Sequence, residues 1–246
     1  MLSKTHSKYI QTLHHKKNRD AENVFIAEGN KTVTELLQSK TMICRELFST
    51  TQWMHGNEAF IRKYYQGPLQ TTELHELEKI SALSTPSQVL AVFAKPAAKN
   101  FSAKNKITIA LDDIQDPGNI GTIIRTADWF GIVNIICSPH SADMYNPKVV
   151  QSTMGSIARV NVLYADLAEW ITQQKAVKVF AAALDGKNIA ALKDIKEGVV
   201  LIGNESKGIG AGLMQMADEK ITITKFGGAE SLNAAVATGI ILSHIF

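Results

Sequence analysis

The sequence predicts an α/β protein in two parts, and the larger C-terminal part is predicted to hold a parallel sheet. From residue 107 onward, short continuous apolar runs alternate with helix-like runs, which is typical of a parallel sheet covered by helices on both faces. Three of these apolar runs lead into glycine mixed with polar and charged residues. Such a mixture is not typical of a packed core, and it favours a functional site at the carboxyl ends of the strands.

The N-terminal part, residues 1–95, is predicted to be a small α/β domain. Ser3 can cap its first helix, and Gly29 with Asn30 turns the chain into another helix. Helices are expected over residues 3–15, 31–38, 57–65 and 72–79, and strands over 24–27, 42–48 and 89–93. Residues 96–105 combine Pro, Ala, Ser and Lys without a hydrophobic period, and we interpret them as an interdomain linker.

The C-terminal part, residues 106–246, is predicted to be one domain. Strands are expected over residues 107–111, 133–137, 177–183, 199–203 and 221–223, and helices over 119–130, 147–153, 167–174, 212–217 and 232–246. The last of these helices is apolar nearly all round, so we expect it to be buried. Ser231 is the predicted cap of this helix.

The composition excludes several classes of protein. A chain of 246 residues with 45% hydrophobic and 20% charged residues is typical of a globular protein, and it contains neither a membrane-length apolar run nor a signal-peptide core. Cys44 and Cys137 are too few for a disulfide framework, so a cytoplasmic location is expected. The net charge of +3 does not by itself demand nucleic acid.

The charge is nevertheless concentrated at the N-terminus. Five cations face the single acid Asp20 within residues 1–20: Lys4, Lys8, Lys16, Lys17 and Arg19. Phosphate backbones attract such clusters, although a solvated helix face gives the same pattern.

The first polar block runs from Asp112 to Gly131 and contains a candidate anion-binding arginine. Asn119 can cap the helix that follows, and Arg125 lies off its apolar stripe, where a guanidinium suits a phosphate. The alternative is a surface arginine paired with Asp128 or Asp116. A metal site at Asp112, Asp113 and Asp116, the acids at the start of the block, is disfavoured because no histidine supports them.

The second and third blocks each place polar residues after a strand. Gly203 and Glu205 begin a glycine-rich stretch in which Ile209 follows Gly208, so the phosphate-gripping lysine of a P-loop is missing and a simple glycine-rich turn stays possible. In the third block, Asn233 is an amide at the start of an apolar helix. Capping does not require it there, and a buried amide needs several partners.

Together the three blocks resemble the SpoU/TrmH family of RNA ribose 2′-O-methyltransferases, within the SPOUT superfamily. The resemblance covers residues 107–246 and is carried by three ordered motifs: Asp112, Asp116, Pro117, Asn119, Gly121, Arg125, Ala127, Phe130 and Gly131; Gly203, Asn204, Glu205 and Gly208; Ser231, Leu232, Asn233, Val236 and Ala237. More loosely, residues 19–37 are similar to the ribosomal-protein-like substrate-binding domain of many members.

The resemblance implies a deep trefoil knot in the C-terminal chain, S-adenosylmethionine as methyl donor and no metal. The cofactor would contact Gly203, Ile223 and Leu232. Arg125 would be central to catalysis, as a base or a positioning group, with its partners drawn from the other motif residues: Asn119, Glu205, Ser231 and Asn233. A homodimer through the C-terminal domain is implied, although the apolar last helix by itself favours burial within one subunit.

The N-terminal resemblance favours RNA as the ligand of the basic cluster, with Lys16, Lys17 and Arg19 as the expected contacts. It also favours ribosomal RNA over transfer RNA as the substrate. Three other functions stay open: a transfer-RNA 2′-O-methyltransferase, an enzyme that methylates a base nitrogen, and a non-catalytic RNA-binding factor. The chain departs from the family where Thr224 and Lys225 replace the usual Pro-Met. This departure puts the fine choice of substrate in doubt.

Overall fold

The computed structural model describes residues 2–192 and 195–246, and the chain divides into two compact units. One unit combines Met1–Ala97 with Asp143–Ala158, and the other combines Ala98–Ala142 with Arg159–Phe246. The expected helix over residues 147–153 therefore forms, as α8 (Pro147–Ser152), but its contacts group it with the N-terminal unit. The predicted boundaries placed residues 143–158 in the C-terminal domain, because these residues lie between strands of that domain in the sequence. Their packing partners belong to the N-terminal unit.

The first unit is built on a four-stranded sheet of order β1-β4-β2-β3. Its strands are β1 (Val24–Glu28), β2 (Ile43–Ser49), β3 (Leu69–Thr71) and β4 (Val89–Ala94). One face carries a core to which α1 (Lys4–Thr12) and α6 (Leu74–Ile80) contribute. On the other face Phe25 stacks on Phe93 and contacts Tyr145 in the inserted segment, while α3 (Asn30–Gln38) packs against β1 and β4.

Three elements of this unit were not predicted. The helix expected over residues 3–15 ends at Thr12, and a separate helix, α2 (Lys16–Glu22), follows it and stops at Asn23, which adopts a left-handed conformation with φ 52°. The helix α4 (Thr51–Gly56) precedes α5 (Glu58–Tyr64), and the short β3 extends the sheet. All three are short, so their hydrophobic periods are too brief to detect.

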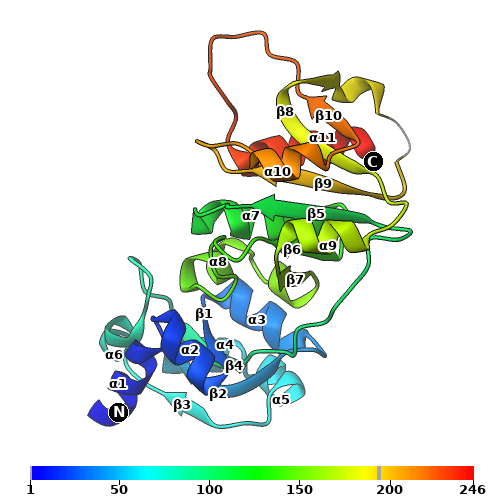
Figure 1. Ribbon diagram of the computed structural model, residues 1–246. Helices are drawn as coiled ribbons and strands as arrows, with labels where there is room; N and C mark the ends of the chain where they lie inside the picture. The colour runs from blue at the N-terminus through cyan, green and yellow to red at the C-terminus, as the bar shows by residue number, and fades with distance from the viewer. Residues whose placement is uncertain (1, 193–194) are drawn as a thin grey trace. The chain divides into compact units, whose positions relative to one another are not determined.

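The second unit holds a six-stranded sheet of order β10-β8-β9-β5-β6-β7, and every pair of neighbouring strands is parallel (Figure 1). The strands are β5 (Ile107–Asp112), β6 (Asn134–Cys137), β7 (Asn161–Tyr164), β8 (Val179–Asn188), β9 (Gly198–Gly203) and β10 (Glu219–Thr222). The predicted parallel sheet is confirmed. The strand β7 was missed, because at the sheet edge it is only partly apolar.

Helices cover both faces of this sheet, as predicted. The core of one face includes side chains of α9 (Leu167–Gln173) and α10 (Ala211–Gln215), while α7 (Pro117–Trp129) and α11 (Ala234–Ile245) pack against each other on the opposite side (Figure 1). Short 3-10 turns also occur at Ser156–Ala158, in the first unit, and at Ile189–Ala191, in the second. Within the described residues, no helix is long and apolar enough to cross a membrane.

The expected linker is structured over its second half. Ala103 is fully buried, and Phe101 packs edge-on against Trp170 of α9. The side-chain oxygen of Gln174 accepts hydrogen bonds from the Ala103 amide and the Ser102 hydroxyl. This stretch therefore belongs to the second unit, although its composition is that of a linker.

Candidate active site

The first two motifs meet at adjoining strand ends, because Asp112 and Gly203 are direct partners across β5 and β9. Two hydrogen bonds lock the loops that follow. The Asp112 carboxylate accepts the Gly210 amide at 2.8 Å, and the Asn204 side chain donates to the Asp113 carbonyl at 2.8 Å. The carboxyl edge of the parallel sheet thus sets the positions of both motifs.

A chain of side-chain hydrogen bonds then joins all three motifs. Asn233 donates from Nδ2 to Oδ1 of Asn119 at 2.9 Å, and Asn119 donates from Nδ2 to the Glu205 carboxylate. The Oδ1 atom of Asn233 accepts the Ala235 and Val236 amides, so its Nδ2 must face Asn119. Each group in the chain then has one consistent role, because the carboxylate at the end can only accept.

The residues that cap the two helices differ from the prediction. Asp116 caps α7 by accepting the Asn119 amide at 2.8 Å, with Pro117 in the first turn, so Asn119 does not cap the helix and its side chain is free to join motifs. Asn233 caps α11, whereas Ser231 lies two residues earlier on an exposed loop. The predicted capping role of Ser231 is therefore wrong, and Asn233 is exposed rather than buried.

Arg125 is exposed on α7, and its predicted alternative partners are occupied. Asp128 pairs with Arg159 at 2.8 Å, and Asp116 is the helix cap. Among the described residues Arg125 has no hydrogen-bond or ion-pair partner. The reading of Arg125 as half of a local surface pair is therefore wrong, and its guanidinium stays available to an anion.

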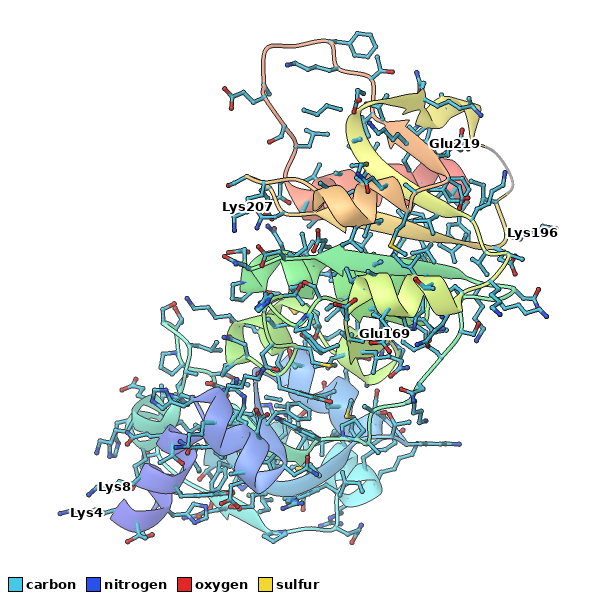
Figure 2. The ribbon with its side chains drawn as sticks, viewed as in Figure 1. Lys4, Lys8, Glu169, Lys196, Lys207 and Glu219 are labelled. Atoms are coloured by element: carbon cyan, nitrogen blue, oxygen red, sulfur yellow. The ribbon has the colours of Figure 1, made fainter. Side chains whose placement is uncertain are left out.

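Gly203 is required by the turn that follows it. A Cβ atom at this position would lie 2.3 Å from the backbone carbon of Gly208, because residues 204 and 208 form a tight antiparallel bridge. The Asn204 side chain accepts two amides inside this turn, and Lys207, labelled in Figure 2, reaches the Asp113 carboxylate at 3.5 Å. The simple reading of a glycine-rich turn thus holds for Gly203, and any ligand there meets its backbone.

The three expected cofactor residues lie at or near the same edge of the sheet. Gly203 ends β9, Ile223 follows β10 directly, and both strands flank β8. Ile223 is partly buried, and Leu232 is 44% exposed on the loop before α11. The three positions together offer backbone groups and two apolar side chains.

The expected RNA contacts of the first unit divide into two kinds. Lys16 and Lys17 are exposed in the first turn of α2, and Lys4 and Lys8 of the same basic cluster project outward from α1 (Figure 2). In that turn the cations oppose the helix dipole, so they do not serve the stability of the helix.

The prediction that Arg19 contacts RNA is wrong, because its side chain is enclosed within the first unit. Arg19 is 1% exposed, pairs with Asp143 at 2.6 Å, and donates to the Leu13 and His14 carbonyls at 3.0 and 2.7 Å. Its Nε atom has no partner among the described atoms. Arg19 is a structural residue that fixes the inserted segment.

The three acids considered for a metal site, Asp112, Asp113 and Asp116, all have other roles. Asp112 and Asp116 accept backbone amides, and Asp113 accepts the Gln115 side-chain amide at 2.9 Å. The described parts of the chain contain no group of three or more His, Cys, Asp or Glu residues placed to hold a metal ion.

Three large apolar side chains on or next to α7 and α11 are exposed. These helices lie side by side with their N-terminal ends together, since Asn119 meets Asn233 and Phe130 stacks on Phe246. The helix α11 was expected to be buried all round, but Val236 is 51% and Phe246 65% exposed, and Trp129 of α7 is 85% exposed. We call Trp129, Val236 and Phe246 the α7–α11 surface.

The fold and the site define an α/β protein with a strand-end site made by three polar loops. The profile of the SpoU rRNA methylase family matches residues 106–243, and that of the MRM3-like substrate-binding domain matches residues 4–91. The chain belongs to the SpoU rRNA methylase family, which confirms the predicted resemblance.

Individual relatives extend over both units. The chain is 33% identical over 240 residues to the 23S rRNA (guanosine(2553)-2′-O)-methyltransferase RlmP of Bacillus subtilis, covering 95% of this chain and 92% of the relative. A solved TrmH-family protein from Porphyromonas gingivalis is 33% identical with a TM-score of 0.85, covering 99% of this chain and 98% of its own. An rRNA methyltransferase of Sinorhizobium meliloti, solved with S-adenosylmethionine bound, is 30% identical with a TM-score of 0.83, covering 99% of this chain and 95% of its own.

Proposed function

We propose that this protein transfers the methyl group of S-adenosylmethionine to the 2′-hydroxyl of a ribose in ribosomal RNA, in the cytoplasm. The observation that carries the proposal is the hydrogen-bonded chain Asn233–Asn119–Glu205, which joins the three motifs. Asn119, the middle residue of this chain, lies on α7 together with the unpaired Arg125. The relative in Bacillus subtilis, which spans both units, is named for this reaction on 23S rRNA.

The residues at the strand ends fit the cofactor. Ile223 and Leu232 offer partly exposed apolar side chains to an adenine, and Gly203 offers backbone groups at the end of β9. Side chains at Gly227 and Gly228 would meet nothing within 4 Å, so the loop before α11 has room to adjust around a ligand. When bound, the cofactor supplies a methyl group activated by its sulfonium charge.

Arg125 is proposed as the group that positions the RNA. A guanidinium keeps its protons in proteins and presents a planar set of donors, so it suits a phosphate next to the acceptor ribose better than it suits a base. From there it stabilises the negative charge that develops on the 2′-oxygen as the hydroxyl proton passes to solvent water. Holding the 2′-oxygen in line with the methyl group supplies the rest of the rate increase.

Asn119 and Glu205 are proposed to hold the site together. One hydrogen of the Asn119 amide goes to Glu205 and one lone pair receives Asn233, which leaves one donor and one acceptor position for the ribose or for Arg125. Ser231, exposed beside the cap residue, completes the set from the loop. None of these roles needs a metal ion.

The first unit is proposed to bind the RNA through Lys16 and Lys17. Their exposure in the first turn of α2 and their unfavourable position in the helix dipole support a role outside folding. The match of residues 4–91 to a substrate-binding domain supports the same role for this unit.

We also propose that two copies associate through the α7–α11 surface. Trp129, Val236 and Phe246 are each more than half exposed on, or directly after, adjoining helices, and a two-fold dimer can bury the same apolar side chains of both copies against each other. Arg125 lies one turn before Trp129 on α7, so the dimer would bring this arginine close to the second copy.

The proposed function is tested by methyl transfer from labelled S-adenosylmethionine to total RNA from cells that lack the activity. Large ribosomal RNA and transfer RNA are separated and counted, with Arg125→Ala protein as the control. We expect label in the large ribosomal fraction that the variant does not produce. Label in the transfer-RNA fraction alone would favour a transfer-RNA enzyme, and RNA binding without any label would favour a non-catalytic factor.

A further inference from the structure

The loop between β10 and α11 is fixed at both ends. At its start, the Thr224 hydroxyl accepts the Asn188 side-chain amide at 2.7 Å, and the Thr222 hydroxyl donates to the Leu184 carbonyl at 3.2 Å. At its end, Asn233 caps α11 and donates to Asn119. Figure 1 shows this loop leaving the second unit after β10 and returning at the start of α11.

Between these fixed ends, the loop presents an aromatic ring to solvent. Residues 224–233 are all exposed, and Phe226 is 96% exposed, more than any other large apolar side chain among the described residues. No described aromatic ring stacks on it. Gly227 and Gly228 follow it, and a Cβ atom at either position would meet nothing within 4 Å. The ring therefore contributes nothing to the core.

The residues around Phe226 indicate which ligand its ring would meet. Lys225 is exposed next to it. S-adenosylmethionine carries a net positive charge, because its sulfonium and ammonium outweigh its one carboxylate, so a lysine ammonium is attracted far more strongly by a polyanion. Gly227 and Gly228 follow the ring, the loop's one acid, Glu230, lies four residues on, and Leu232 is the one other large apolar side chain exposed in residues 224–233. Phe226 therefore lacks the broad apolar surroundings that a second protein copy would bury. A nucleic-acid strand, with a base beside a phosphate, matches both side chains.

We propose that Phe226 stacks on a nucleobase of the substrate RNA close to the acceptor nucleotide, while Lys225 meets a phosphate of the same strand. This inference rests on the proposed function and adds to it a specificity-determining pair. Thr224 fixes the start of the loop, and Lys225 with Phe226 forms its RNA-facing part. Stacking of this kind requires an unpaired base, so the pair selects a single-stranded or looped acceptor.

The first test compares Phe226→Ala, Phe226→Leu and Phe226→Trp in the full-length protein. We expect the Kd for a large-subunit ribosomal RNA fragment to rise about 5- to 150-fold for Ala, the range measured for one base–aromatic stack. Leu is expected to weaken binding similarly, because it keeps an apolar surface without a π face, whereas Trp is expected to preserve it. Leu184→Ala is the matched control, since Leu184 is 78% exposed in the same unit.

The second test is the salt dependence of binding. Lys225→Ala is expected to lower the slope of log Kd against log salt by about 0.7, the contribution of one phosphate contact on a single strand. Phe226→Ala is expected to leave that slope unchanged, because stacking releases no counterions.

Three outcomes would overturn the pair's proposed role. Phe226→Ala could leave the RNA Kd and kcat/KM unchanged, it could weaken S-adenosylmethionine binding as much as RNA binding, or it could shift the monomer–dimer balance in sedimentation. The second would assign the ring to the cofactor and the third to a protein interface. These results are distinct from failure of the proposed function, which would appear as an absence of methyl transfer by the wild-type protein.

Discussion

Arg125 and Arg19 show how differently two arginines of one functional prediction can be placed. Arg125 was expected to act in catalysis, and Arg19 was expected to contact RNA. Arg125 is exposed, and the two acids near it in sequence are already occupied by Arg159 and by the cap of α7. Arg19 is 1% exposed and is held by two carbonyls and the Asp143 carboxylate. The guanidinium of Arg125 is therefore available to a ligand, whereas that of Arg19 is bound within the first unit.

The difference lies in where the partners come from. The acids considered as partners of Arg125, Asp116 and Asp128, lie within nine residues of it and are visible in the sequence. The partner of Arg19 lies 124 residues away, in a segment inserted from the C-terminal half. A cluster of cations predicts charge but not exposure, so a long-range partner can remove one member from the RNA-binding surface while its neighbours Lys16 and Lys17 stay exposed.

The largest expected effect is on stability, at Arg19. Arg19→Met keeps much of the side-chain volume but leaves the Asp143 carboxylate without its partner, and we expect a loss of about 3–5 kcal/mol in the free energy of unfolding. Urea unfolding followed by circular dichroism measures this. The double variant Arg19→Met/Asp143→Leu is expected to recover part of the loss, because the unpaired charge is gone. Weaker RNA binding at unchanged stability would instead make Arg19 an RNA contact.

Arg125→Ala is expected to lower kcat/KM about 100- to 1,000-fold, as removal of one charge-stabilising donor does. The free energy of unfolding should change by less than about 0.5 kcal/mol, because the side chain is exposed and unpaired. Arg125→Lys keeps the positive charge but lacks the planar set of donors of a guanidinium, so its activity should fall between that of the wild type and that of Arg125→Ala. Near-normal activity of Arg125→Ala would remove the arginine from the site.

Asn233→Asp separates the capping role of Asn233 from its link to Asn119. Aspartate caps a helix as well as asparagine does, but it cannot donate to the Asn119 oxygen. We expect unchanged stability and a fall in kcat/KM of about 2- to 10-fold, which is the net value of one hydrogen bond. If Asn233→Ala and Asn233→Asp proved equally stable and fully active, the link between the motifs would have no catalytic role.

The smallest effect concerns a second buried polar group of the first unit. Burial raises the pKa of Glu28, and this outweighs the lowering by its hydrogen bonds from the Ser81 hydroxyl at 2.5 Å and the Ala82 amide at 2.8 Å. An acid with a raised folded-state pKa adds stability below its unfolded pKa, and that contribution is lost as the pH rises through the folded value.

Glu28→Gln should therefore gain stability relative to the wild type as the pH rises from about 4 to 7, and the two should differ by less than about 1 kcal/mol at neutral pH. Glu78→Gln, an exposed acid of α6, is the control. A wild-type protein that instead gains stability relative to Glu28→Gln with rising pH would reverse the predicted direction.

The sequence predicted most of the second unit because its strands are continuous apolar runs, and a parallel sheet brings their polar ends to one edge. It also held a signal for the cap of α7, since Asp116 precedes Pro117 and proline favours the first helical position. The hydrogen bonds of Asn119 could not be predicted, because Glu205 and Asn233 lie 86 and 114 residues away. The trefoil knot stays a prediction of the family resemblance.

The chemical identity of the methylated product tests the assignment of this site to a ribose 2′-hydroxyl most directly. Ribosomal RNA labelled by the wild-type protein is hydrolysed in alkali, which cannot cleave the linkage after a 2′-O-methylated ribose. We expect all the label to remain in alkali-resistant dinucleotides and Arg125→Ala to yield none. Label released as single nucleotides would mean methylation of a base, and it would contradict the assignment of this site to the ribose.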